Sequence, residues 1–205
     1  MKQNNFKVIG LTGSIGSGKS TVSGILKSLN IKVIDADKVS RVAAEDATVL
    51  LRLKEEFGDN IVDEYGHLKR KELGSIVFRS KEKLNTLNSI IHPVMREIIL
   101  NEIKLLKLTE KICVLDAAIL IESGFVDMVN EVVLVLASEE KIITRVQKRD
   151  GYNKEYIKKI LDTQMDINEK KKYCSYIINN DKGINELYNE VIKMLVALDM
   201  EAVDA

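Results

Sequence analysis

Cysteines and long apolar runs are both scarce in this chain. The two cysteines, Cys113 and Cys174, lie far apart and lack the spacing of metal ligands. A disulfide framework and a cysteine-based metal site are therefore not expected, and we predict two reduced, buried thiols. No apolar run approaches the ~20 residues that a membrane-spanning helix requires, and the N-terminus enters its first strand without an apolar signal-peptide region. We expect a cytoplasmic protein with no membrane partner.

An excess of charge of either sign is also missing. Lysine plus arginine and aspartate plus glutamate number 31 each, so the formal net charge is +0. Without a global basic field, nothing indicates a nucleic-acid partner. The 205 residues, 45% of them hydrophobic and 30% charged, fit one globular domain with insertions. The sequence shows no internal repeat or low-complexity linker and indicates no obligate protein partner.

One motif stands out, the run GSIGSGKS at 13–20. It fits the phosphate-binding loop pattern of glycine, four residues, then Gly-Lys-Ser. A short, mostly apolar strand is predicted before it, over 6–11. A helix is predicted after it, because apolar residues recur at helical spacing at Val22, Ile25, Leu26 and Leu29. The alternative, a chance glycine-rich turn, does not explain the flanking strand and helix.

The residue types of this loop suit a nucleoside triphosphate. Glycines let backbone N–H groups point inward at phosphate oxygens, and the following helix presents the positive end of its dipole to the anion. Lys19 can reach the β- and γ-phosphates, and the Ser20 hydroxyl can ligate Mg²⁺. We expect the nucleotide to be held by Gly13, Ser14, Ile15, Gly16, Ser17, Gly18, Lys19, Ser20 and Thr21.

Two further predicted strands end in aspartate. The first, over 31–35, leads into Asp35-Ala36-Asp37, and alternation along an extended segment would put Asp35 and Asp37 on one side of it. They would lie at the carboxyl end of a strand, where open α/β sheets bind ligands. One or both could instead cap the helix that follows. The second strand, Ile112–Asp116, is apolar and ends in a Walker-B-like acid, Asp116.

Between these strands, residues 38–108 are predicted to be helical almost throughout, which is too long for a plain crossover between parallel strands. An inserted helical subdomain explains the length, with a break after the helix that ends at Gly58. The only proline, Pro93, suits the first turn of a helix over 94–108, which puts His92 at the mouth of that helix. A histidine there is more often a structural hydrogen-bonding residue than a catalytic one.

A second helical stretch, over about 139–172, is dense in charge. Arg145 and Arg149 stand four residues apart and therefore share one helix face. The segment 150–153 then breaks the helix, so the stretch resembles a helical hairpin that could close over phosphates. A merely solvated charged face is the alternative.

The remaining segments complete an α/β pattern. Strands are predicted over Glu131–Leu136 and Tyr176–Asn179, and a final amphipathic helix over about 184–198. Strands that alternate with helices predict a doubly wound parallel sheet, here five-stranded, with helices on both faces and the phosphate loop after its first strand.

With these motifs placed, the chain resembles the dephospho-coenzyme A kinases, a family of P-loop kinases, over nearly its whole length. Beyond the loop each motif alone is weak, but their order and spacing together are specific. The residues that carry the resemblance are 10–13 and the loop, 34–37, 66–70, Leu73, Phe78, 91–93, Asp116, 120–122, Arg145, Arg149, Asp150, Gln164 and Asn180.

The resemblance implies ATP-dependent phosphorylation of the ribose 3′-hydroxyl of dephospho-CoA, the final step of coenzyme A biosynthesis. It also implies three parts: a nucleotide-binding core over about 6–37, 109–138 and 173–205, a helical substrate insert over about 38–108, and a lid over about 139–172.

The resemblance and the motifs together give a set of expected site residues. The catalytic residues are Lys19, Asp37, Asp116, Arg145 and Arg149. Asp37 is expected to be the base, while Asp116, through water, and Ser20 hold Mg²⁺; which aspartate lies nearer the acceptor stays open. Asn180 joins the ATP site. The expected contacts with dephospho-CoA are Thr12, Asp37, Arg70, His92, Leu120 and Glu122.

The chain departs from the family pattern at three places. Ser14 stands where the family usually has glycine, which a small polar residue should tolerate. At 118–122 the chain has Ala-Ile-Leu-Ile-Glu where the family often has Pro-Leu-Leu-Phe-Glu, so a rigid turn and an aromatic ring are missing near expected substrate contacts. Tyr65 stands where many relatives have aspartate, which affects a distant turn.

Two other functions fit parts of the sequence. A nucleoside monophosphate kinase, or another small-molecule P-loop kinase, would share the architecture but not the large insert after Asp37 or the junction at 91–93. A GTP-binding switch protein would usually read guanine through an Asn-Lys-x-Asp turn, whereas this chain has Asn-Asn-Asp-Lys at 179–182, in the wrong order.

Overall fold

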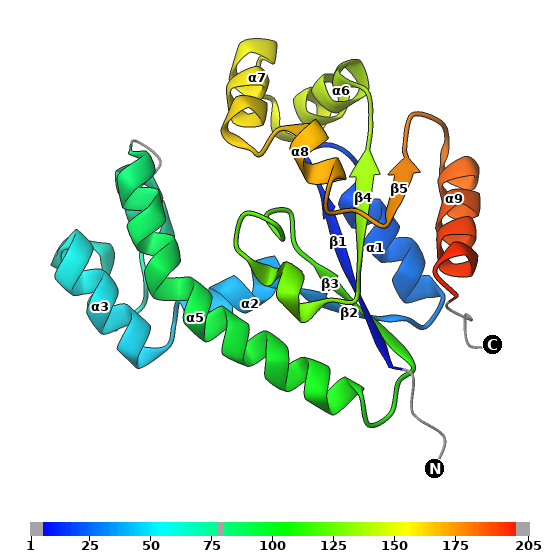
Figure 1. Cartoon of the computed structure of the whole chain (residues 1–205). Coiled ribbons are helices and arrows are strands. Elements are labelled where there is room, and N and C mark those ends of the chain that lie inside the picture. The colour runs from blue at the N-terminus through cyan, green and yellow to red at the C-terminus, as the bar shows by residue number, and fades with distance from the viewer. Residues whose placement is uncertain (1–5, 78–79, 200–205) are drawn as a thin grey trace. The chain divides into compact units, whose positions relative to one another are not determined.

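The computed structural model describes residues 6–77 and 80–199 (Figure 1). Phe78, one of the residues behind the resemblance, lies outside these ranges. The chain divides into two compact units, Met1–Ile34 with Ile103–Ala205, and Asp35–Glu102. The first contains the sheet and the phosphate loop, and the second is helical. That the second unit is a substrate-binding subdomain remains a prediction.

The first unit is built on a five-stranded sheet in the order β2-β3-β1-β4-β5. Its strands are β1 (Lys7–Gly13), β2 (Lys32–Asp35), β3 (Ile112–Asp116), β4 (Glu131–Leu136) and β5 (Tyr176–Asn179). β1 pairs in parallel with both β3 and β4, and β4 pairs in parallel with β5. The predicted five-stranded parallel sheet is therefore confirmed, and β1 lies at its centre because strands from later in the chain add on both sides.

Helices α1 (Lys19–Ser28) and α9 (Ile184–Ala197) pack against the sheet and against each other (Figure 1). The side chains that alternate along β1 explain why. Ile9 and Leu11 point to one face and join one hydrophobic cluster with the buried side of α1 and with α9. Leu26 and Val191 in these helices are fully buried. The helical spacing of apolar residues after the phosphate loop thus predicted this contact correctly.

The opposite face of β1 is covered by the segment that follows β3. Gly10 lies between Ile9 and Leu11 and therefore faces the other way. A side chain at Gly10 would run into Leu120 and Val129, so glycine lets this segment pack directly on the strand. Leu120 is fully buried there, and Phe125 in the 3₁₀ helix η2 (Phe125–Met128) is 2% exposed.

Three helices follow β4, namely α6 (Glu139–Asp150), α7 (Lys154–Thr163) and the short α8 (Ile167–Lys171). α6 and α7 pack through a small cluster of buried side chains, Ile142, Ile143, Val146 and Ile157. Gly151, at φ 73°, ends α6 in the left-handed conformation that favours glycine, and the Asn153 side chain caps α7. The predicted helical hairpin with its break at 150–153 is therefore present.

The second unit contains α2 (Ala36–Ala43), α3 (Ala47–Phe57), the 3₁₀ helix η1 (Asp59–Ile61), α4 (Arg70–Val77) and most of α5 (Lys81–Leu106). α3 ends at Gly58, as predicted. Asp63 organises the following turn by accepting hydrogen bonds from the backbone of Tyr65 and His67. This turn holds the pKa of Asp63 below its usual value.

The prediction that a helix begins at Pro93 is wrong, because α5 runs through this residue without interruption. Proline removes one backbone hydrogen bond and crowds the preceding turn, which normally ends or kinks a helix. Here the buried side of the helix continues across the proline, from Ile90 and Ile91 to Met95 and Ile99. Their burial outweighs the local cost, so His92 lies inside a helix and not at its mouth.

The two thiols are free, as expected, but they are not equally buried: Cys113 is buried and Cys174 is half-buried. Burial raises the pKa of Cys113 to about 12 and that of Cys174 to about 11. Both groups therefore stay protonated, and unreactive as nucleophiles, near neutral pH.

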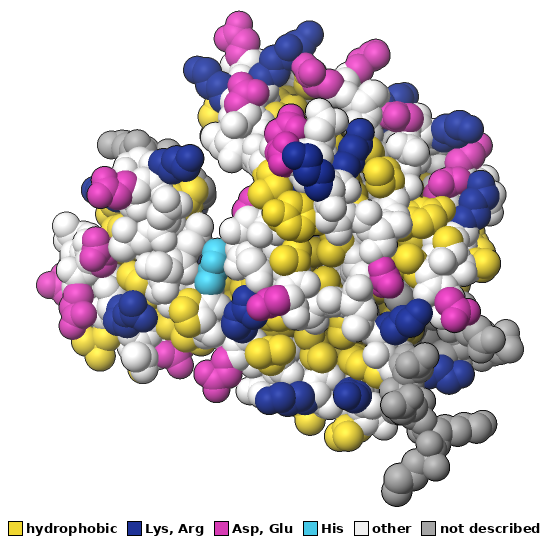
Figure 2. Space-filling model, in the orientation of Figure 1, with side chains coloured by type: hydrophobic (Ala, Val, Ile, Leu, Met, Phe, Trp, Pro, Cys, Tyr) yellow, Lys and Arg dark blue, Asp and Glu magenta, His cyan; other side chains and the backbone are white. Residues whose placement is uncertain are grey.

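Charged side chains of both signs are intermixed on the face shown in Figure 2. This distribution fits the equal numbers of acidic and basic residues. Among residues 6–77 and 80–199, the structure has no helix that combines the length and apolarity needed to cross a membrane.

Candidate active site

The phosphate loop joins β1 to α1, as its sequence predicted. Gly16 and Gly18 have φ angles of 73° and 96°, in the left-handed region that side chains disfavour. A side chain at Gly16 would also collide with Val146 of α6, and one at Gly18 would collide with Asn180. Glycine is therefore required at both positions for two reasons. It allows the positive φ angles, and it leaves room for Val146 and Asn180 to pack against the loop.

Lys19, the first residue of α1, forms an ion pair with Asp116 at the end of β3. The parallel register pairs Leu11 with Asp116, which brings the end of β3 beside the start of the loop. The second oxygen of Asp116 accepts a hydrogen bond from Ser23, which is 4% exposed. Sequence analysis found Lys19 and Asp116 but missed Ser23, which lies one helical turn after Lys19 on the same side of α1.

Arg145 reaches from α6 to the back of the phosphate loop. Its guanidinium donates to the carbonyl oxygens of Gly16 and Ser17 at 3.4 and 3.3 Å, and to the Asn180 carbonyl at 2.7 Å. The Asn180 side chain, which follows β5, donates in turn to the Ser17 carbonyl at 2.7 Å. Arg145 in α6 and Asn180 after β5 therefore both hold the loop by donating hydrogen bonds to its backbone carbonyls.

Arg149 lies elsewhere. It forms a two-point ion pair with the adjacent Asp150, with both N–O distances 2.8 Å, and its side chain is 59% exposed. This interaction raises the pKa of Arg149 and lowers that of Asp150. The two arginines were expected to act together on one helix face, but only Arg145 contacts the loop in this structure.

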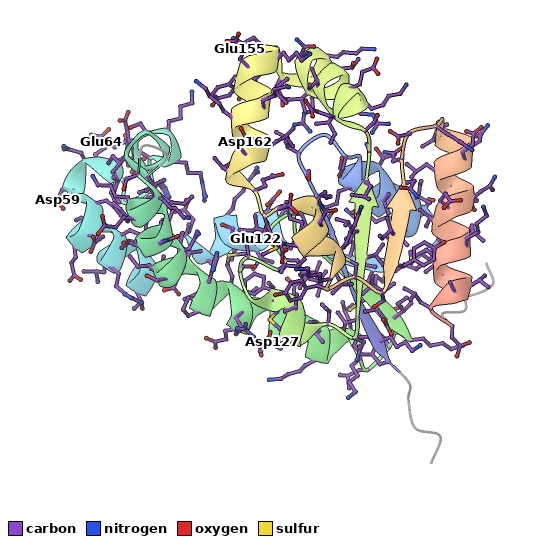
Figure 3. All side chains as sticks on the ribbon, turned by 45° about the horizontal axis from the view of Figure 1, so that its top comes forward. Asp59, Glu64, Glu122, Asp127, Glu155 and Asp162 are labelled. Atoms are coloured by element: carbon purple, nitrogen blue, oxygen red, sulfur yellow. The ribbon has the colours of Figure 1, made fainter. Side chains whose placement is uncertain are left out.

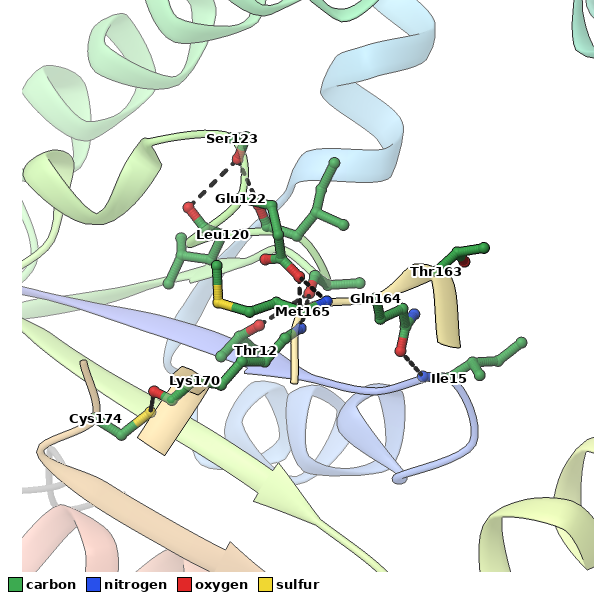
Figure 4. Close-up of polar contacts among 12 residues, drawn as sticks. Thr12, Ile15, Leu120, Glu122, Ser123, Thr163, Gln164, Met165, Lys170 and Cys174 are labelled. Atoms are coloured by element: carbon green, nitrogen blue, oxygen red, sulfur yellow. Dashed lines mark hydrogen bonds and ion pairs between the residues drawn. The ribbon is translucent and has the colours of Figure 1, made fainter. Parts of the chain in front are cut away.

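The segment after α7 also touches the loop. The Gln164 side chain accepts a hydrogen bond from the Ile15 backbone N–H at 3.3 Å (Figure 4). A cavity of about 360 Å³ lies beside this contact, lined by Ser14 and Ser17 of the loop and by Ile142, Leu161 and Met165 from the helical stretch after β4. The Ser17 hydroxyl is buried and has no hydrogen-bond partner within the part of the chain that the structure describes.

Three expected substrate contacts lie on β1 and the segment after β3. Thr12 is fully buried and donates to the Ala118 carbonyl at 3.0 Å. Leu120 is fully buried under Gly10, so its side chain presents no surface to a ligand in this structure. Glu122 lies next to α8 and pairs with Lys170 at 2.9 Å (Figures 3 and 4). Sequence analysis missed Lys170 entirely.

The expected base, Asp37, lies in the first turn of α2 and is exposed. The prediction that it continues an extended segment with Asp35 is wrong, because α2 begins at Ala36. The reason is capping: the Asp35 side chain accepts hydrogen bonds from the backbone of Asp37 and Lys38 at 3.0 and 3.1 Å. The alternative that one of the two aspartates caps the helix is therefore confirmed for Asp35.

Arg70 and His92 belong to the second unit. Arg70 donates to the Glu45 carboxylate and to the Arg41 carbonyl, each at 2.9 Å. His92 is half-buried in α5, and burial, with a smaller contribution from the positive charge of Arg96, lowers its pKa. The lowered pKa favours the neutral imidazole of His92 at physiological pH, which suits a hydrogen-bonding residue.

The phosphate loop and Asp116 supply oxygen atoms that could coordinate Mg²⁺ or its bound water. Residues 6–77 and 80–199 contain no cluster of three or more His, Cys, Asp or Glu side chains that could hold a metal by themselves. Mg²⁺ in phosphoryl-transfer sites normally keeps several waters and uses one or two protein oxygens together with the phosphates. The exposed Ser20 hydroxyl and the Asp116 carboxylate fit that pattern.

Comparison with known proteins decides the family. A family model described as Dephospho-CoA kinase matches residues 7–186. The chain belongs to the dephospho-CoA kinase family. The Dephospho-CoA kinase of Fusobacterium nucleatum subsp. nucleatum is 38% identical over 186 residues, which cover 90% of this chain and 94% of the relative.

Two solved structures are similar to this chain. TT1252 from Thermus thermophilus has 30% sequence identity and a TM-score of 0.84, and the match covers 96% of this chain and 100% of that one. The dephospho-CoA kinase from Campylobacter jejuni has 29% identity and a TM-score of 0.63, with 93% and 96% covered. The predicted P-loop kinase fold is thereby confirmed.

As a dephospho-CoA kinase, the protein uses ATP to phosphorylate dephospho-CoA in the biosynthesis of coenzyme A. The predicted family, kinase activity and phosphoryl donor are confirmed. The family assignment also decides against the nucleoside monophosphate kinase and the GTP-binding switch protein.

The packing of Asn180 against Gly18 gives a matched pair of glycine variants in this kinase. Gly18→Ala places a side chain at positive φ and against Asn180, so we expect a loss of about 1–3 kcal/mol of stability and of most ATP affinity. Gly24→Ala lies in the middle of α1, with nothing within 4 Å of the added carbon, and should stabilise by about 0.5–1 kcal/mol. Thermal unfolding and ATP-binding calorimetry measure both effects. Equal ATP affinities in the two variants would contradict this account of the loop.

Proposed function

We propose that this dephospho-CoA kinase transfers the γ-phosphoryl group of ATP to the ribose 3′-hydroxyl of dephospho-CoA, with Mg²⁺ as the metal. The observation that carries the assignment of roles is the ion pair of Lys19, the first residue of α1, with Asp116 at the end of β3. This ion pair connects the lysine of the phosphate-loop motif to the aspartate at the end of β3.

Lys19 would bind the β- and γ-phosphates, and these phosphates would compete with Asp116 for its ammonium group. Ser23 would then keep Asp116 oriented, because its hydrogen bond holds the second carboxylate oxygen. The backbone N–H groups of the loop would bind phosphate oxygens, and glycines at 16 and 18 leave these groups uncovered. Arg145 and Asn180 support the loop from behind.

Ser20 and, through water, Asp116 would hold Mg²⁺. When bound, Mg²⁺ neutralises charge on the β- and γ-phosphates and aligns them. Asp116 suits an indirect role because its side chain is 11% exposed, enough to accept from a water molecule while Ser23 fixes it.

Asp37 would act as the base for the acceptor hydroxyl. A ribose hydroxyl is a poor nucleophile, and in a loose transition state the base chiefly orients it and takes its proton late. Asp37 is exposed and free of the capping role that occupies Asp35, so its carboxylate is available for this work. Thr12, Arg70, His92 and Glu122 remain proposed acceptor contacts, but Leu120 does not, because its side chain is buried under Gly10.

Arg145 and Arg149 would offset the negative charge that spreads over the transferring group. The planar guanidinium can grip two phosphate oxygens at once. Arg145 already lies against the loop, whereas Arg149 would have to leave Asp150 and move with the lid. Closure would also exclude water, which competes as acceptor.

Removing the Lys19 charge tests the central assignment. Lys19→Ala should lower turnover by roughly two to three powers of ten while the fold is retained, because one preorganised charge at phosphates is worth about 3–4 kcal/mol. Lys27→Ala, an exposed lysine later in α1, is the matched control. Formation of coenzyme A from dephospho-CoA and ATP is the assay. Near-normal activity of a folded Lys19→Ala variant would rule out the role.

The two aspartates are separated by their dependence on magnesium. Asp37→Asn should lose turnover that no concentration of Mg²⁺ restores, because the proton acceptor is missing. Asp116→Asn should instead shift the Mg²⁺ concentration needed for half-maximal rate. Initial rates over a magnesium series, at saturating ATP and dephospho-CoA, distinguish the patterns. The reverse pattern would exchange the two roles.

The lid arginines differ in what they touch, so their variants should differ. Arg145→Ala should weaken ATP binding, since it removes four hydrogen bonds that hold the loop and Asn180. Arg149→Ala should leave ATP affinity unchanged and lower turnover by roughly two powers of ten. Lys148→Ala, the exposed neighbour on α6, is the control. If Arg149→Ala changes neither quantity, Arg149 belongs to a solvated helix face.

A further inference from the structure

Lys170, near the end of α8, is the one charged residue in the described part of the chain whose side chain is 0% exposed. Burying an ammonium group is costly unless it is paired and hydrogen-bonded. A lysine near the end of a short helix could easily point into solvent, and its neighbours Lys171 and Lys172 are exposed. Its burial therefore indicates a specific set of partners.

Two partners come from the segment after β3. The Lys170 ammonium lies 2.9 Å from a Glu122 carboxylate oxygen and donates to the Ala118 carbonyl at 3.3 Å (Figure 4). The same carbonyl accepts from the Thr12 hydroxyl at the end of β1. One side chain of the lid thus fixes both ends of 118–122 and connects to the residue just before the phosphate loop.

The Glu122 carboxylate is held from a second direction. The oxygen that pairs with Lys170 also accepts a hydrogen bond from the Met165 backbone N–H at 3.4 Å. Met165 follows Gln164, whose side chain binds the Ile15 backbone of the phosphate loop. The segment 164–170 therefore contacts the phosphate loop at one end and the segment 118–122 at the other.

We propose that Lys170 is a positioning residue for the acceptor substrate: it sets the placement of Glu122 and of 118–122 toward dephospho-CoA and anchors the foot of the lid to them. The inference rests on the proposed contact of 118–122 with dephospho-CoA. In this chain the segment lacks the rigid turn that a proline at Ala118 would give. The buried Lys170 ammonium instead restrains the segment by donating a hydrogen bond to the Ala118 carbonyl.

A purely structural lysine and a positioning lysine differ in kinetics. Loss of a structural contact lowers the unfolding temperature and leaves the two Michaelis constants alone. Loss of a positioning contact raises KM for dephospho-CoA selectively, because Glu122 and Ala118 are no longer fixed while the ATP contacts are untouched.

The test compares Lys170→Met, which keeps the length of the side chain, with Lys170→Arg, which keeps its charge. Lys172→Met removes an exposed lysine from the same segment and is the matched control. For Lys170→Met we expect KM for dephospho-CoA to rise roughly ten- to a hundredfold, as for loss of a charged hydrogen bond, with KM for ATP within about twofold of wild type. Lys170→Arg should recover most of the loss, and Lys172→Met should match wild type.

Glu122→Gln completes the experiment. If Lys170 acts through Glu122, adding Lys170→Met to Glu122→Gln should raise KM for dephospho-CoA little further, since the two changes remove the same interaction. Should Lys170→Met not fold, Lys170→Gln takes its place, because its amide can still donate to the Ala118 carbonyl but carries no charge to pair with Glu122, and we expect the same selective rise. Additive effects, equal changes in both KM values, or unchanged KM values with only a lower unfolding temperature would overturn the proposal.

A wild-type enzyme that makes no coenzyme A from dephospho-CoA would instead refute the function on which the proposal rests.

Discussion

The parallel pairing of β1 with β3 on one side and β4 on the other is the constraint on which the site depends. Asp116, Arg145 and Asn180, which surround the phosphate loop, all come from segments at or after the carboxyl ends of β3, β4 and β5. Asp116 ends β3, α6 with Arg145 follows β4, and Asn180 follows β5. Because parallel strands end at the same edge, residues separated by most of the chain meet around one short loop. The loop needs positive φ angles at two glycines, and this ring of contacts keeps it in that conformation.

The sequence was most informative where function and local structure use the same residues. A phosphate loop requires its own glycines, lysine and serine, and the strand and helix beside it have clear periodicity, so this part of the fold and site could be predicted residue by residue. Helix ends at Gly58 and Gly151 were predictable for a similar local reason. The errors arose where tertiary packing prevailed. Buried residues on both sides of Pro93 carry α5 through it, and a capping aspartate turned the expected extended segment at Asp37 into a helix.

Residues that act by contact across long sequence distances could not be predicted. Ser23 and Lys170 belong to no motif, and each is identified only by the carboxylate that it meets, Asp116 or Glu122. In the sequence, Lys170 is one of three consecutive lysines, and only burial distinguishes it from the other two. For Arg149 the spacing from Arg145 predicts a shared role, which remains a prediction, whereas its ion pair in this structure is with the next residue in the chain, Asp150.

The central place of β1 has a consequence for how the protein is made. The partners of β1 all come later in the chain: the backbone of Val8 is hydrogen-bonded to the side chain of Asn130, 122 residues later, and the Lys7 ammonium donates to the Leu198 carbonyl, 191 residues later. Such long-range pairing makes folding slow, because a long loop must close before the contacts form. During synthesis, β1 and the glycine-rich loop must therefore wait for β3 and β4, and an apolar strand stays exposed meanwhile. Aggregation during translation, rather than instability of the finished enzyme, is the hazard that this topology carries.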